Sequence, residues 1–130
     1  CRFKIAGRPE SGGVRTWRIE FTEQARPTII TDRQDRDVPA SGSFLVEQNT
    51  GAITETVLRI ANRDYSTEIV ARFSLNPALG MWVPSEMREV YRTTRLPASR
   101  PESAILKGTA RYSNFRRFQV LTDAVIAIKK

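Results

Sequence analysis

Apolar and polar side chains alternate along much of this chain, most clearly over residues 65–75. Tyrosine, threonine, isoleucine, alanine, phenylalanine and leucine occupy every second position there, while Glu68 and Arg72 lie between them. This period of two is typical of an antiparallel strand that buries one face and exposes the other to water. The same pattern predicts strands over residues 14–23 and 43–47.

Turn-forming residues separate the predicted strands. Residues 48–51 end in Gly51, which can take a positive φ, and an asparagine and an aspartate flank Arg63 in the next turn. Asn76-Pro77 follows the clearest strand and favours a turn. The remaining strands are predicted at residues 1–5, 52–60, 81–83, 87–92, 105–112, 115–120 and 124–128. Two long loops are predicted at residues 31–43 and 93–103.

The segment after Trp82 is ambiguous, because Pro84-Ser85 resembles the start of a capped helix. Met87, Glu89 and Tyr91 instead follow a period of two, which favours a strand. Strand patterning resumes after each long loop, so residues 1–130 are predicted to form a single antiparallel all-β domain. No apolar run approaches the roughly 18 residues that a membrane-spanning helix needs.

Several chemistries are excluded by composition and spacing. The chain has no histidine and one cysteine, which removes histidine-based nucleophile pairs, disulfides and most zinc sites. Asp32, Asp35 and Asp37 lack the glycine and distal glutamate of a calcium loop, and they are interpreted as solvated loop residues. Glu86 and Glu89, three apart on a strand, face opposite ways and cannot act as paired carboxylates. We expect no enzyme activity, metal or cofactor.

The formal net charge of +7 raises the question of anionic partners. The cations are scattered and interleaved with fourteen acidic residues, as on an ordinary solvated surface. Residues 111–118 interleave arginine with aromatic residues, as single-strand binders do. Lys107-Gly108, however, lacks the aromatic residues that an RNA-recognition strand places after it. Nucleic acid is therefore not the expected partner, and Tyr112, Phe115 and Phe118 are predicted to pack on the sheet.

The first residue, Cys1, has two interpretations. It could be the lipidated residue of a bacterial lipoprotein, which would anchor the protein to a membrane. Such proteins usually place a flexible linker after this cysteine, whereas Phe3 and Ile5 follow at once and predict a strand. The second interpretation, an ordinary strand cysteine in a mature protein or in a piece of a longer one, is therefore preferred.

Residues 42–87 carry a recognisable succession of motifs. These are Gly42-Ser43-Phe44-Leu45-Val46, a turn to Gly51-Ala52-Ile53, Thr67-Glu68-Ile69-Val70-Ala71-Arg72-Phe73, Asn76-Pro77 and Trp82-Val83-Pro84. The succession resembles the bacterial outer-membrane lipoprotein-localisation (LolA/LolB-like) family. The resemblance implies a strongly curved antiparallel sheet, forming an incomplete β-barrel over an apolar cavity for lipid. The chain is shorter than such domains and no convincing lid helix is predicted, so it is either a piece of a larger LolA-like domain or one with an open or absent cavity.

We therefore expect a curved antiparallel sheet with an apolar concave face. The residues predicted to line that face are Trp17, Ile19, Phe21, Phe44, Val46, Ile69, Phe73, Trp82 and Tyr112. The first functional hypothesis is a non-catalytic, extracytoplasmic (periplasmic) bacterial domain that binds a lipid or another apolar small molecule there. The second is a protein-interaction or structural module whose apolar face packs on a partner domain. The sequence leaves the ligand and the oligomeric state open.

Overall fold

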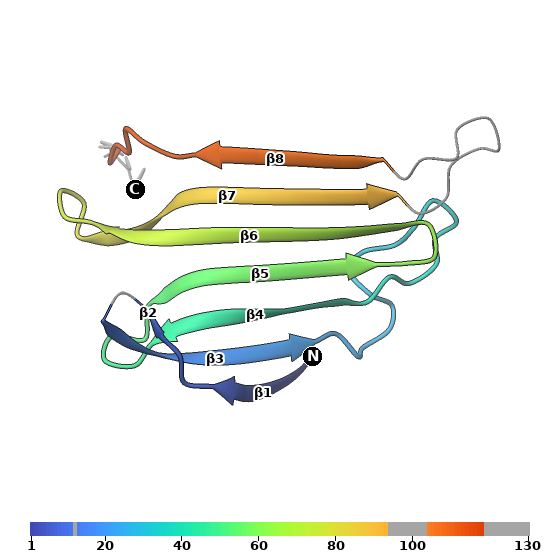
Figure 1. The fold of residues 1–130 in the computed structure, drawn as a ribbon, viewed down its shortest axis with the longest axis horizontal. Coiled ribbons are helices and arrows are strands. Elements are labelled where there is room, and N and C mark those ends of the chain that lie inside the picture. Colours follow the sequence, from blue (N-terminus) through green and yellow to red (C-terminus); the bar gives the residue numbers. More distant parts are fainter. Residues whose placement is uncertain (12, 94–103, 119–130) are drawn as a thin grey trace, which may run out of the picture.

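The computed structural model describes residues 1–11, 13–93 and 104–118, which form antiparallel strands and contain no helix (Figure 1). None of the described residues therefore belongs to a helix that could span a membrane. The strands are β1 (Arg2–Gly7), β2 (Glu10–Ser11), β3 (Val14–Thr22), β4 (Ala40–Glu47), β5 (Ile53–Ala61), β6 (Tyr65–Asn76), β7 (Met81–Thr93) and β8 (Ile105–Arg111).

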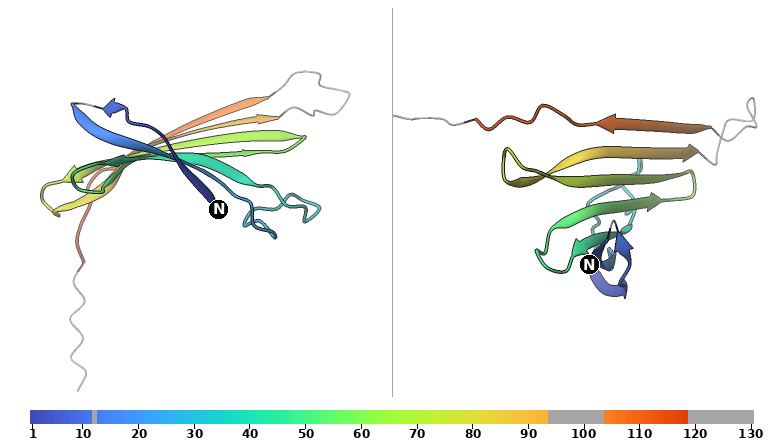
Figure 2. Two further views of the ribbon diagram at one scale, coloured as in Figure 1. Left: turned by 90° about the horizontal axis from the view of Figure 1, so that it is seen from below. Right: turned by 60° about the vertical axis from the view of Figure 1, so that its left-hand side comes forward.

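The sheet is a meander, with the order β1-β3-β4-β5-β6-β7-β8, and the short β2 pairs with the start of β3. Because β1 and β8 are the two ends of this path and do not pair with each other, the sheet is not closed into a barrel. Figure 2 shows a single twisted layer, with the segment between β3 and β4 beside one end of the strands. The prediction of an all-β antiparallel fold is confirmed for the described residues; a single domain over residues 1–130 and its relation to a larger LolA-like domain stay predictions.

Strand β7 is continuous where the sequence predicted two separate strands. Arg72 pairs with Glu86 but the next residue, Phe73, pairs with Pro84, so Ser85 is an extra residue in β7. Such a bulge keeps a strand in the sheet while it absorbs one residue, and it also tolerates a proline. The ambiguous segment is therefore a strand, as the alternation predicted.

Two boundaries were predicted wrongly. Strand β4 begins at Ala40, inside the predicted loop 31–43, because Ala40 pairs with Ile60 of β5. The described part of the predicted strand 115–120, residues 115–118, is not in a strand. Asn114 has a φ of 58°, and this left-handed conformation turns the chain out of an extended path. Residues 94–103 of the second loop, residues 119–120 and the predicted strand 124–128 lie outside the described residues.

The predicted turns are present, and their residues explain how they close. Gly51 and Gly80 have φ values of 72° and 63°, the left-handed region that favours glycine, at the ends of the β4–β5 and β6–β7 turns. In the β5–β6 turn, the side-chain oxygen of Asn62 accepts the N–H groups of Asp64 (2.8 Å) and Tyr65 (2.9 Å). These turns set the register of the strands that they join.

Cross-strand pairing sorts the side chains into two faces, because directly paired residues point to the same side of a sheet. The face that we call the apolar face carries Phe3, Ile5, Trp17, Ile19, Phe21, Phe44, Val46, Ile53, Leu58, Ile60, Ile69, Phe73, Leu75, Trp82, Met87, Tyr91, Leu106 and Tyr112. The opposite, charged face carries Lys4, Glu20, Glu55, Arg59, Glu68, Arg72, Glu86, Arg88 and Arg111.

Ion pairs cross the charged face from strand to strand. Glu86 lies 2.7 Å from Arg88, 3.5 Å from Arg111 and 3.8 Å from Arg72, which also pairs with Glu55 at 3.1 Å. Exposed pairs of this kind each stabilise a protein by about 0–1 kcal/mol. Their larger effect is on register, since a slip by one residue would turn these charges onto the apolar face.

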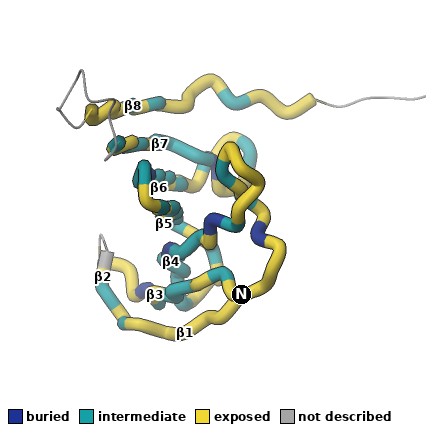
Figure 3. The backbone as a smooth tube through the Cα atoms, turned by 90° about the vertical axis from the view of Figure 1, so that its right-hand side faces the viewer, coloured by how far each residue is buried: buried dark blue, intermediate teal, exposed yellow. Residues whose placement is uncertain are grey.

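Few side chains are buried anywhere in the described part of the chain (Figure 3). Its buried apolar residues are Val38, Val57 and Val83. Val38 belongs to the β3–β4 segment, and the pairing of Val57 with Ser43 and of Val83 with Ser74 places those two valines on the charged face. A sheet with one apolar face normally buries it against a second layer. No second layer of helices or strands is found among the described residues, so much of the apolar face is open.

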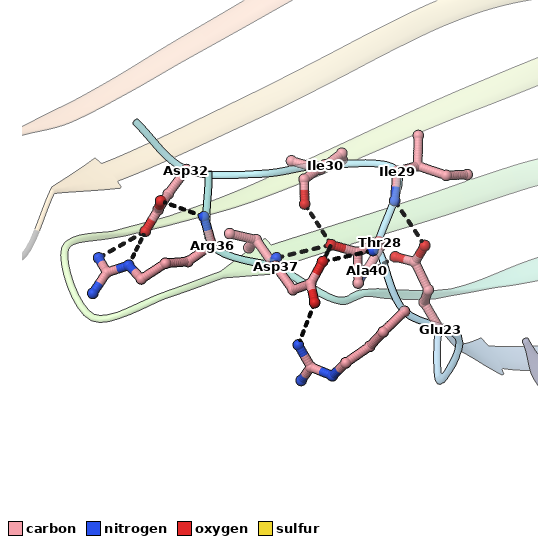
Figure 4. A network of polar contacts seen from close by, with 10 residues as sticks. Glu23, Thr28, Ile29, Ile30, Asp32, Arg36, Asp37 and Ala40 are labelled. Carbon is pink, nitrogen blue, oxygen red and sulfur yellow. Dashed lines mark hydrogen bonds and ion pairs between the residues drawn. The ribbon is translucent and has the colours of Figure 1, made fainter. Parts of the chain in front are cut away.

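The β3–β4 segment is held in shape by carboxylates that accept its backbone N–H groups (Figure 4). The Asp37 carboxylate accepts the Thr28 N–H (2.7 Å) and a guanidinium N–H of Arg26 (2.7 Å). The Thr28 hydroxyl accepts the Val38 N–H at 3.0 Å. Thr28 and Val38 are both buried as a result.

Two further carboxylates act in the same way in this segment. Glu23 accepts the N–H groups of Ile29 (3.1 Å) and Ala40 (3.0 Å), and Asp32 accepts the backbone and guanidinium N–H groups of Arg36. Hydrogen bonds to the charged form lower the pKa of a carboxyl group. The backbone N–H groups lower the pKa of Glu23, and the Arg36 guanidinium lowers that of Asp32. Asp32 and Asp37 therefore hold the segment in shape, whereas the sequence pattern indicated only solvated loop residues.

Acidification should loosen the β3–β4 segment. The Thr28 N–H lowers the pKa of Asp37 in the folded protein, below the value of about 3.9 of an unfolded aspartate. The stabilisation is therefore complete above about pH 4–5 and is lost as the pH falls through the folded pKa. Hydrogen exchange should show the Thr28 amide losing protection below about pH 4.

Asp37→Asn should weaken that protection already at neutral pH. The matched control is Asp35→Asn, because Asp35 makes none of these carboxylate bonds. Protection of the Thr28 amide that is unchanged between pH 6 and pH 3 would contradict the role assigned to Asp37.

Phe73→Ala should destabilise the protein moderately. Phe73 is half-buried on the apolar face and pairs with Pro84, so its loss should cost about 1–2 kcal/mol in urea unfolding. Arg72→Ala, on the charged face, should cost no more than about 1 kcal/mol. A loss of 3–5 kcal/mol at Phe73 would mean a fully buried core position. A larger loss at Arg72 than at Phe73 would contradict the assignment of the two faces.

Candidate binding surface

The nine residues that the sequence singled out lie on the apolar face, in two groups. The first group lies on β3 and β4, where Trp17 pairs with Val46 and Ile19 pairs with Phe44, and Phe21 follows on β3. The second group, at the opposite edge, is Phe73, Trp82 and Tyr112. Ile69 lies between the groups and pairs with Leu58 of β5. The alternation thus brought together residues from four strands and Tyr112, which directly follows β8.

Aromatic rings continue the first group to the edge strand β1. The ring centroids of Phe21 and Phe44 are 5.2 Å apart, and those of Phe3 and Phe21 are 6.4 Å apart. Gly42 makes this row possible, because a Cβ at that position would lie 2.7 Å from the Phe21 ring and 1.8 Å from the Val57 carbonyl oxygen. The Phe21 ring therefore occupies the space above β4 that any other residue at position 42 would need.

The second group depends on the bulge at Ser85. Trp82 and Met87 are an odd number of residues apart, and in a regular strand they would face opposite sides. The extra residue shifts the alternation, so Trp82 pairs with Leu75 while Met87 pairs with Ala71, on the same face. The Tyr112 hydroxyl lies 3.8 Å from the Met87 sulfur. The bulge thus continues the apolar face to the β6–β7 turn.

The sequence prediction missed the outer parts of this face. Phe3 and Ile5 on β1 are 60% and 64% exposed, and Leu106 on β8 is 67% exposed. Alternation within these short strands would have indicated them, but only pairing with β3 and β7 shows which face they extend. The apolar face therefore runs across all seven strands of the path, from one edge to the other.

Two of the hollows formed by the described residues are lined mostly by polar and charged residues. One, of about 410 Å³, lies between the tip of the β3–β4 segment and the β5–β6 turn, with Asp32, Asn62 and Tyr65 in its lining. Another, also of about 410 Å³, is on the charged face and includes Arg18 and Ser43. A third, of about 450 Å³, is lined by Leu79, Gly80, Met81, Arg116 and Arg117. None of the three is lined by more than one of the nine predicted residues, so the open apolar face is the stronger candidate for binding.

The carboxylates offer little catalytic chemistry in this arrangement. Glu86 pairs with Arg111 on the charged face, whereas Glu89 pairs with Gly108 on the apolar face, so the two point to opposite sides, as the strand pattern predicts. The described residues contain no group of three acidic or cysteine side chains that could hold a metal ion. The side chains that the apolar face presents are thus chiefly ones that make apolar contacts.

Comparison with known proteins adds no relative to this description. No family model, curated protein or solved structure gives a significant match to the chain. The resemblance to the lipoprotein-localisation family stays a prediction.

Proposed function

We propose that this chain is a non-catalytic binding module whose apolar face is covered by an apolar layer of a protein partner. The observation that carries the proposal is the open apolar face across seven strands. Leu75 is 53% exposed and Trp82 is 37% exposed, although both belong to the apolar side of an amphipathic sheet. Contiguous apolar surface of this kind marks an interaction site.

The extent of the face suits a protein partner. Seven strands spaced by about 4.8 Å, with roughly eight residues of about 3.3 Å each, give a face of roughly 750 Å². Stable protein–protein interfaces bury about 800 Å² on each partner. A lipid, in contrast, needs a pocket that encloses most of its surface, and one open layer provides only one wall. These dimensions favour the protein-interaction hypothesis over the lipid hypothesis.

A synthetic peptide that takes the place of the partner's apolar layer tests the proposal directly. An 18-residue amphipathic helical peptide with leucine on one side and glutamine on the other should change the fluorescence of Trp17 and Trp82 in a saturable way. Leu75→Glu places a charge on the apolar face and should abolish the change. Ser74→Glu, the neighbouring exposed position on the charged face, should leave it intact.

The peptide result distinguishes the two hypotheses when a fluorescent fatty acid is titrated in parallel. Peptide binding that depends on Leu75, without saturable fatty-acid binding, supports the protein layer. Saturable fatty-acid binding without peptide binding would overturn the proposal in favour of the lipid hypothesis. Peptide binding that survives Leu75→Glu would also overturn it, because the apolar face would then not be the binding surface.

The purified protein should show no hydrolysis of ester, phosphate or glycoside substrates above the buffer rate. Glu86 is held by arginines, and Glu89 lies on the other face, so these two carboxylates cannot act on one substrate. Standard chromogenic substrates provide the measurement. Turnover that is abolished by Glu86→Gln or Glu89→Gln would contradict the non-catalytic assignment.

A further inference from the structure

Glu89 is a charged residue on the apolar face, next to the edge strand β8. It lies on β7, pairs with Ile69 of β6 on one side and with Gly108 of β8 on the other, and is half-buried. Its neighbours along β7 on the same face are Met87 and Tyr91. Covering a carboxylate with another apolar layer costs desolvation free energy unless the carboxylate is paired with a cation or hydrogen-bonded.

The carboxylate of Glu89 has a defined position. A Cβ at Gly108 would lie 2.5 Å from Oε1 and 2.8 Å from Cγ of Glu89, so the missing side chain at position 108 is what lets Glu89 lie across β8. The Tyr91 hydroxyl donates a hydrogen bond to Oε2 at 3.0 Å. This hydrogen bond to Glu89 raises the pKa of the Tyr91 phenol above its ordinary value.

Carboxylates on the charged face differ from Glu89 in their partners. Glu20 lies 3.1 Å from Lys4, and Glu68 lies 2.7 Å from Arg59. No cation among the described residues lies within ion-pair distance of Glu89. A carboxylate accepts about four hydrogen bonds, and Tyr91 supplies one. Glu89 therefore keeps acceptor capacity toward whatever covers the face.

We infer that the protein segment covering the apolar face carries a lysine or arginine that pairs with Glu89. The inference rests on the proposed function and names the chemistry of the partner. A second copy of this chain, presenting the same face, would bring another carboxylate instead of a cation. An apolar segment with one basic residue satisfies both the apolar surroundings and the charge, and a charge-assisted hydrogen bond in a water-poor contact is a strong one.

Two matched peptides test this inference. Both are the 18-residue amphipathic helix described above, and one carries a lysine in the centre of its leucine side where the other carries a glutamine. The wild-type protein should bind the lysine peptide about tenfold more tightly, as expected for a hydrogen bond to a charged group. Glu89→Gln should abolish this preference and leave binding of the glutamine peptide unchanged.

Two further variants test whether the preference for the lysine peptide depends on where the Glu89 carboxylate lies, and not only on the net charge of the protein. Gly108→Ala keeps the carboxylate but forces it to move, so the preference should fall below about threefold. Glu68→Gln removes an equal charge from the opposite face and should keep the tenfold preference. Both variants leave the apolar side chains in place, and circular dichroism of each verifies that the sheet is intact.

The outcomes distinguish this inference from the proposed function. If the wild-type protein binds both peptides equally, the inference is wrong and the proposed function stands, with Glu89 serving to keep an open face soluble. A preference that persists in Glu89→Gln also overturns the inference. If neither peptide binds, the proposed function fails, and the inference fails with it.

Discussion

The register of strand pairing is the constraint on which this structure depends. Side chains in a β-strand alternate between faces, so the backbone hydrogen bonds that fix the register also decide which residues meet. At the centre of the sheet, Leu58 pairs with Ile69 on the apolar face, while the adjacent Arg59 and Glu68 pair on the charged face. A shift by one residue would exchange these two faces along a whole strand, and the amphipathic character of the sheet would be lost.

The register is maintained by local devices at particular residues. Asn62 closes the β5–β6 turn with its side chain, and Gly80 closes the β6–β7 turn with a positive φ. The bulge at Ser85 then corrects the phase of β7, so that Trp82 joins the apolar face instead of the charged one. Turns and bulges of this kind set the phase of side-chain alternation in each strand relative to its neighbours. They therefore determine how far a continuous apolar surface extends across the sheet.

The same single layer that limits the buried core leaves the apolar face open. The charged face is satisfied by its own ion pairs, such as Arg59 with Glu68, and faces water. The apolar face has no comparable partner among the described residues, and the β3–β4 segment lies beside only one end of the strands. Any layer that covered the apolar face would therefore also stabilise the fold, because it would bury the side chains that a second layer normally buries.

The sequence by itself determined most strands, most turns and the two-sided character of the sheet, because alternation and turn chemistry are local properties. It also placed nine residues, including Trp17 and Phe73, on the face where the structure has them. Only the tertiary structure decided that β7 continues through its bulge, that Gly108 makes room for Glu89, and that Asp37 organises the β3–β4 segment. Each of these depends on residues distant along the chain, whose proximity no local pattern encodes.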